Sequence, residues 1–160
     1  LFAAFAAPRS LAAMRSLYWT FAVLQGPGLA LLLSAYAGAD AFKAAAAAAA
    51  VFGAASLYGY TTGRDLSSIA SFLFVGLLGL IAASLLNLAL GSPAVDFAVS
   101  AAAVIVFTGL AAWDTQRLKD SYDGTSPEGR ALARYDAALG MYISVLNLFQ
   151  AILGLIGRDE

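Results

Sequence analysis

Five long uncharged runs, separated by short charged segments, dominate the sequence. They are Ser16–Ala39, Ala44–Gly63, Leu66–Val95, Phe97–Trp113 and Ala137–Gly157. An α-helix rises about 1.5 Å per residue, so about 20 residues cross the hydrocarbon core of a bilayer. The pattern predicts an all-α polytopic membrane helix bundle that forms a single transmembrane domain, with spans at approximately 16–38, 43–60, 67–90, 96–114 and 136–156.

The composition supports a lipid environment and narrows the chemistry. Hydrophobic residues make up 61% of the chain and charged residues 12%, whereas soluble domains are about 45–50% apolar and about 25% charged. The net charge of −1 gives no indication of nucleic-acid binding. The chain has no cysteine and no histidine, which excludes disulfides, thiolate metal sites and serine–histidine catalysis. We therefore expect a lipid-embedded protein that is not an enzyme and holds no cofactor or metal.

The distribution of Lys and Arg predicts the orientation of the spans. If the five spans alternate, seven of the nine basic residues lie on one side, and Lys43 and Arg158 lie on the other. The loop 114–136 falls on the basic side and is predicted to be cytoplasmic. The apolar stretch Leu1–Pro8 is too short to span, and we interpret it as the end of a helix that begins outside the sequence. The first span is therefore expected to be poorly covered, while the other four pack closely.

Two features of the second span suggest close packing. Ala44–Ala50 is an uninterrupted alanine run, and alanine forms helix well but seeks lipid less than leucine does. The pairs Ala49/Gly53 and Ala55/Gly59 place small residues four apart, which lets helices approach closely. This span is expected to lie among its neighbours.

Asp114 directly follows the fourth span, where a carboxylate is costly in lipid. One interpretation is an interfacial ion pair with Arg117, three residues along the helix. The other is a gating or proton-binding carboxylate that faces the interior of the bundle. The spacing leaves both interpretations open.

The last span carries a stripe of small and polar residues on one helical face. We expect this stripe to face inward, chiefly for close packing, with Asn147 able to hydrogen-bond across helices. Ser144 is expected to face Asp114 across the bundle, within reach of a direct or water-bridged hydrogen bond. The stripe consists of Gly140, Ser144, Asn147, Ala151 and Gly154.

A polar segment closes the second span and is read as a structural turn. Its tyrosines suit the membrane interface, and its acidic residue is positioned to cap the next helix. The segment consists of Tyr58, Gly59, Tyr60, Thr61, Thr62, Gly63, Arg64 and Asp65.

Taken together, the motifs resemble the transmembrane Bax-inhibitor-motif family (Bax inhibitor-1 family), in its bacterial branch. The resemblance covers nearly the whole chain, and the Tyr-Gly-Tyr-Thr-Thr and Asp-Thr-Gln segments together are specific. The matching segments are Ser56–Leu66, Phe72–Asn87, Ala112–Arg117 (which includes Thr115 and Gln116) and Met141–Phe149.

The resemblance implies a seven-helix bundle in the bacterial inner membrane, of which this chain holds about five helices. It also implies a pH-sensitive calcium or cation leak in some members, and modulation of membrane proteases or of stress and cell-death responses in others. In the leak model two aspartates share a proton and latch the pore. Asp114 matches the first, but Ser144 stands at the second, which favours the rival function of a non-conducting interaction protein. The pore or gating candidates are Asp114, Ser144, Asn147 and Arg117.

Overall fold

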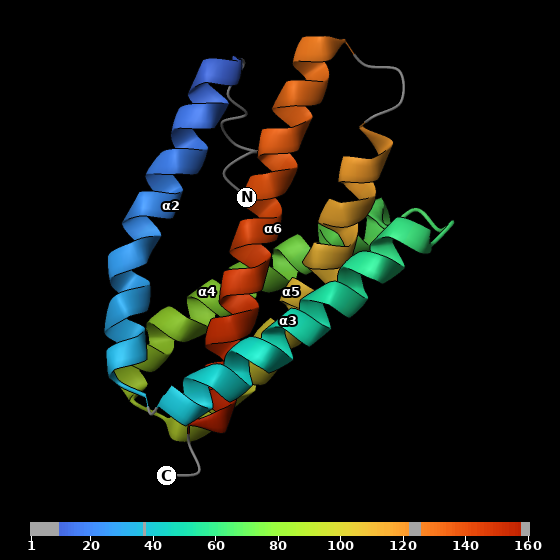
Figure 1. The fold of residues 1–160 in the computed structure, drawn as a ribbon. Helices are drawn as coiled ribbons and strands as arrows, with labels where there is room; N and C mark the ends of the chain where they lie inside the picture. Colours follow the sequence, from blue (N-terminus) through green and yellow to red (C-terminus); the bar gives the residue numbers. More distant parts are fainter. Residues whose placement is uncertain (1–9, 37, 122–125, 158–160) are drawn as a thin grey trace.

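The computed structural model describes residues 10–36, 38–121 and 126–157. Within these ranges the chain forms α-helices and no strand (Figure 1). All five helices are long and apolar enough to cross a membrane, which confirms the all-α membrane bundle. Leu1–Pro8, interpreted above as the end of a further helix, lies outside the described residues. The helices are α2 (Leu11–Ser34), α3 (Gly38–Thr61), α4 (Ser67–Leu90), α5 (Pro93–Asp120) and α6 (Pro127–Ile156).

Local signals set the junction between α4 and α5. Gly91 ends α4 with a φ of 60° and donates its N–H to Asn87 O, a left-handed conformation that favours glycine. The Asn87 side chain accepts a hydrogen bond from Ser92 N at 3.0 Å. Ser92 caps α5, and Pro93 occupies its first turn, where a missing N–H costs nothing. The turn therefore lies between the spans predicted at 67–90 and 96–114.

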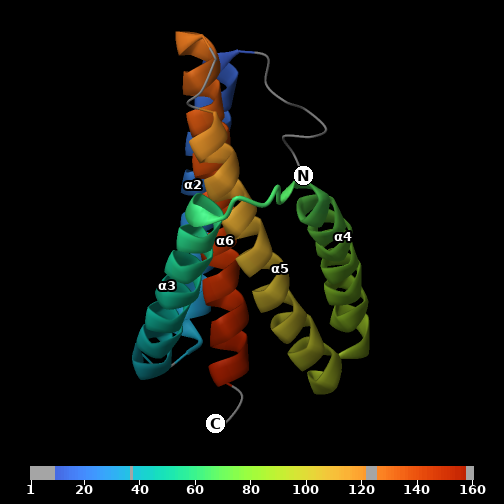
Figure 2. The same ribbon diagram turned by 90° about the vertical axis from the view of Figure 1, so that its right-hand side faces the viewer.

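Helices α5 and α6 form the centre of the bundle. They make the most extensive interhelical contact, and α3 packs against both of them. The core between these three helices includes Ala44 and Ala48 of α3, Phe107 of α5, and Leu148 and Leu153 of α6. The alanine run thus presents one face to the interior, as expected, although its other face is exposed. At one end the α5–α6 hairpin projects beyond the turn between α3 and α4 (Figure 2).

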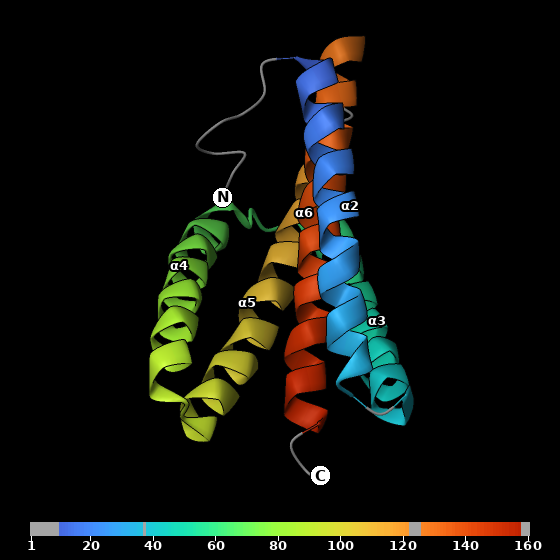
Figure 3. The same ribbon diagram turned by 90° about the vertical axis from the view of Figure 1, so that its left-hand side faces the viewer.

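The two outer helices, α2 and α4, are poorly covered. α2 buries only Met14 among its described residues, in agreement with the expectation for the first span. α4 buries only Ala70 and Leu73, so the expectation that it packs closely is wrong. The reason is that α4 makes its main contact with α5 alone and α2 with α6. Figure 3 shows α4 and α2 on opposite sides of the α5–α6 pair.

Candidate functional site

A cavity of about 340 Å³ lies where α2, α4, α5 and α6 face one another. Its walls are largely apolar, but a small group of charged and polar side chains lies along α5 and α6. The lining residues are Phe21, Phe74, Leu77, Ile81, Phe107, Leu110, Trp113, Asp114, Arg117, Asp136, Leu139, Gly140, Ile143, Ser144 and Asn147. All four pore or gating candidates from the sequence therefore line one cavity.

Asp114 is buried between α5 and α6, with 6% of its surface exposed. A β-carbon added at Gly140 would lie 2.6 Å from both carboxylate oxygens of Asp114. The missing side chain of Gly140 is therefore what lets the carboxylate lie against the backbone of α6. No described residue donates a hydrogen bond to this carboxylate.

Ser144 and Asn147 extend the polar lining along α6. Ser144 is 1% exposed and follows Gly140 by about one helical turn, so it lies on the face that meets Asp114. The hydrogen bond expected between Ser144 and Asp114 stays a prediction. Asn147 Nδ2 donates to Ile143 O at 2.8 Å, within its own helix. This bond uses one amide hydrogen of Asn147, and a bond from Asn147 to another helix stays a prediction.

Arg117 pairs across the bundle and not along its own helix. Its guanidinium forms a salt bridge with Asp136 of α6 and lies 5.0 Å from the centre of the Trp113 ring. Of the two interpretations of Asp114 that the spacing left open, the salt bridge with Arg117 is not formed, although the two charges lie near enough to interact. The reason is that the α5–α6 hairpin brings Asp136 opposite Arg117, whereas Asp114 turns towards Gly140. Asp136 was not among the pore or gating candidates from the sequence, although it lies at the start of the last predicted span.

The Tyr-Gly-Tyr-Thr-Thr and Asp-Thr-Gln segments meet each other beside the cavity. At Gly59 the backbone of α3 approaches the Ala112 carbonyl so closely that a β-carbon would clash with it. Gln116 Oε1 accepts a hydrogen bond from Leu66 N at 2.9 Å, and Gln116 Nε2 donates to Arg64 O at 2.7 Å. We call these two bonds the Gln116 clamp. The clamp fixes the α3–α4 turn onto α5 about half a helical turn beyond Asp114.

Further bonds hold the same turn. Lys119 Nζ donates to Tyr60 O at 2.9 Å and lies 5.3 Å from the centre of the Tyr60 ring. Thr61 Oγ1 donates to Leu57 O at 2.7 Å, and Thr62 Oγ1 accepts from Arg64 N at 3.3 Å. These contacts belong to a turn that joins two helices. Tyr58 is half exposed on the outer surface.

Asp65 and Thr115 also act locally. The Asp65 carboxylate accepts a hydrogen bond from Ser67 N at 2.9 Å, as expected for a residue that caps the next helix. Hydrogen bonds from the backbone and side chain of Ser67 lower the pKa of Asp65 from its ordinary value. Thr115 Oγ1 donates to Ala111 O at 2.9 Å within α5. Neither residue lines the cavity.

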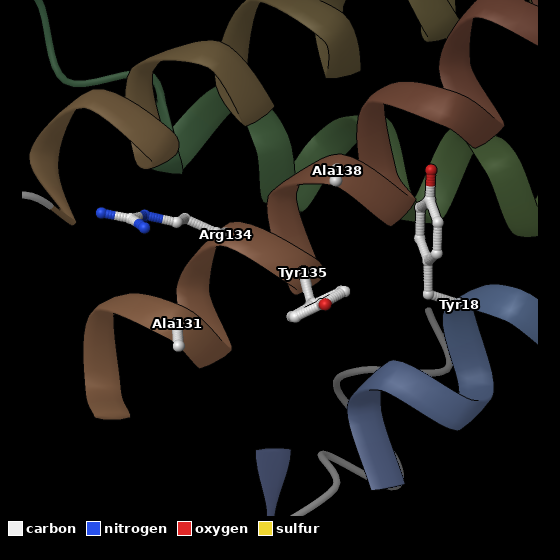
Figure 4. Close-up of a pocket in the computed structure, with 5 residues that line it drawn as sticks. All are labelled: Tyr18, Ala131, Arg134, Tyr135 and Ala138. Atoms are coloured by element: carbon white, nitrogen blue, oxygen red, sulfur yellow. The ribbon is translucent and has the colours of Figure 1, made fainter. Parts of the chain in front are cut away.

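A second cavity, of about 380 Å³, lies between the first turns of α2 and α6. Tyr18 and Tyr135 meet there edge to face, with ring centres 6.1 Å apart. Arg134 points away from both tyrosines (Figure 4). This region is an aromatic contact between two helices. In the described part of the chain, no three acidic, histidine or cysteine residues gather as metal ligands would.

Comparison with known proteins gives a consistent result. The model of the family described as inhibitor of apoptosis-promoting Bax1 matches residues 1–160. A protein of Caulobacter vibrioides is 42% identical over 147 residues, which are 91% of this chain and 59% of that protein. A membrane protein of Streptococcus pyogenes is 35% identical over 158 residues, 97% of this chain and 68% of that protein. The inner membrane protein YbhL of Escherichia coli is 39% identical over 145 residues, 89% of this chain and 62% of YbhL. The chain thus spans about three fifths of the length of the Caulobacter protein and of YbhL.

Proposed function

Because the chain belongs to the family of the inhibitor of apoptosis-promoting Bax1, we propose that it is a multi-pass inner-membrane protein that lets calcium or other cations leak past Asp114. The location rests on the likeness to the inner membrane protein YbhL. The chain covers about three fifths of such relatives, so the leak is proposed for the whole protein. The loop 114–136 is proposed to face the cytoplasm, on the basis of the Lys and Arg distribution.

The observation that carries this proposal is the environment of Asp114. Its carboxylate is buried in an apolar bundle, where ionisable groups are costly and usually serve transport or binding. No described residue donates a hydrogen bond to it, and Arg117 forms its salt bridge with Asp136, so a bound cation would offset part of the cost of burial. Ser144 and Asn147 add oxygen atoms to the same cavity, and oxygen is the ligand that calcium prefers.

Flux from the purified whole protein in liposomes tests the proposal. We expect the parent protein to admit calcium, and Asp114→Asn to lower the initial rate several-fold, because the amide removes the negative charge and keeps the shape. Asp96→Asn is the matched control, since Asp96 lies in the first turn of the same helix and does not line the cavity. A parent without flux, or equal loss in both variants, would contradict the cation leak.

A second candidate function is a non-conducting protein that modulates a membrane protease or a stress or cell-death response. Ser144 favours it, because the carboxylate pair that the resemblance associates with the leak is not completed at that position. A folded parent that conducts neither calcium nor monovalent cations in the liposome assay would support this alternative.

A further inference from the structure

The salt bridge between Arg117 and Asp136 has a defined place relative to the cavity. Arg117 follows Asp114 on α5, so it lies nearer to the α5–α6 loop. Asp136 precedes Gly140 on α6, and because the two helices are antiparallel it also lies nearer to that loop. Both side chains line the cavity. The ion pair therefore stands at the loop end of the cavity, beyond the level at which Asp114 meets Gly140.

Aromatic rings hold this ion pair in place. The Arg117 guanidinium lies over the Trp113 ring, an arrangement that attracts a cation to the ring face. Trp113 in turn meets Phe74 of α4 edge to face, with ring centres 5.5 Å apart. The network thus joins α4, α5 and α6 along the wall of the cavity.

The ion pair is sheltered more than a typical surface pair. The side chains of Arg117 and Asp136 are 38% and 17% exposed. Partial burial weakens screening by salt and strengthens the attraction. Asp114 and Ser144 lie deeper and are almost fully buried, so water entering from the loop end meets the ion pair first.

We propose that the Arg117–Asp136 ion pair, resting on Trp113, is a gate that closes the loop end of the cavity. Breaking the pair admits water to Asp114 and Ser144, and re-forming it excludes water. The inference takes the cavity from the proposed function, but the gate controls access of water whether or not the protein conducts cations.

Cysteine accessibility tests the gate directly, because the chain contains no native cysteine. Ser144→Cys places a thiol of nearly the same size as serine inside the cavity. The full chain in membranes opened on both sides is treated with a water-soluble cationic methanethiosulfonate reagent, and the labelling rate is measured. We expect slow labelling in this background. Asp136→Asn and Arg117→Gln should each raise the rate about tenfold, which corresponds to ~1.4 kcal/mol.

Two further variants separate a gate from a general loosening of the fold. Asp120→Asn removes a carboxylate at the end of the same hairpin, outside the cavity, and should leave labelling unchanged. The exchanged pair Arg117→Asp with Asp136→Arg should return labelling close to the slow background rate. Thermal unfolding in detergent shows that each labelled variant is folded.

Defined outcomes overturn the gate. They are unchanged labelling after Asp136→Asn and Arg117→Gln, equal acceleration by Asp120→Asn, or an exchanged pair as fast as the single variants. In the last case, lost side-chain shape and not the lost ion pair would explain the access. Failure of the cation leak appears separately, as absent flux in liposomes, and does not change the expected labelling rates.

Discussion

The contact between Gly59 of α3 and Ala112 of α5 allows one substitution to be predicted in detail. The two backbones touch because Gly59 has no side chain, and Ala55, Ala111 and Ala112 are buried around the contact. Gly59→Ala adds one methyl group at this point. The neighbouring atoms belong to the backbone of α5, so no side chain can turn aside to make room.

The distances give the magnitude. The added carbon would lie 2.7 Å from the carbonyl carbon of Ala112 and 3.0 Å from its α-carbon, and closer still to the oxygen. Carbon atoms are in optimal contact at about 3.5–4.0 Å, so α3 and α5 have to separate by roughly 1 Å. Overpacking of this kind costs ~1–3 kcal/mol. The separation also stretches the Gln116 clamp, which joins the same two segments.

The matched control lies in the same helix. A β-carbon at Gly53 meets nothing within 4 Å, and alanine forms helix better than glycine by up to ~1 kcal/mol. Gly53→Ala should therefore be neutral or slightly stabilising, whereas Gly59→Ala should unfold at a lower temperature or denaturant concentration in detergent. Equal unfolding midpoints for the two variants would refute the close contact between α3 and α5.

Three other predictions concern the turn and the loop. Gln116→Glu should destabilise the fold by ~1–3 kcal/mol, because the oxygen that accepts from Leu66 N is kept while the amide that donates to Arg64 O is replaced by a second oxygen. Thermal unfolding measures the loss, with Gln116→Met as the variant that removes both hydrogen-bonding groups. Because the pKa of Asp65 is lowered in the fold, the stability it adds is present above its unfolded pKa and is lost as the pH falls through the folded pKa; Asp65→Asn should flatten this dependence in unfolding curves. A cysteine introduced by Ser126→Cys should resist membrane-impermeant thiol reagents in intact cells and react after lysis, and labelling of intact cells would reverse the proposed orientation.

The helices themselves could be predicted from the sequence, because long apolar runs leave the backbone few alternatives in lipid. The ends of the helices were harder to predict. α5 continues to Asp120 and α6 begins at Pro127, beyond the spans expected at 96–114 and 136–156. Charged residues stop an apolar run without stopping a helix, so counting apolar residues underestimates helices that extend past the lipid. The turn at Gly91 could be predicted because Gly91, Ser92 and Pro93 end one helix and begin the next through local backbone effects.

The positions of the helices relative to one another could be predicted only in part. The pair Ala55/Gly59 lies in a close contact, but Gly53 of the similar pair Ala49/Gly53 has no neighbour. The spacing of small residues identifies a helix face that can pack closely. It does not show whether another helix or lipid covers that face. α4 shows the same limit, because its strongly apolar sequence suits both a covered helix and one that faces lipid.

The candidate site shows why its partners were the hardest part to predict. Asp114 and Ser144 were found from their positions on two spans, but the partner of Arg117 depends on how α5 and α6 are aligned. Two carboxylates can lie near Arg117: Asp114, three residues before it on the same helix, and Asp136, nineteen residues after it across the hairpin. The structure places Asp136 in the salt bridge and Asp114 against Gly140.

The same alignment changes what Ser144 means for the proposed leak. Judged by the resemblance alone, serine at this position removes the second carboxylate and weakens the case for cation binding. The described cavity lining nevertheless contains two carboxylates, Asp114 and Asp136, and one guanidinium, Arg117. With all three groups ionised the lining carries a formal charge of −1, and Arg117 forms its salt bridge with Asp136. In the proposed leak, Asp114 would then be the carboxylate that attracts the cation. Proton sharing between two contacting carboxylates is not needed for that attraction, since the second carboxylate is held by Arg117.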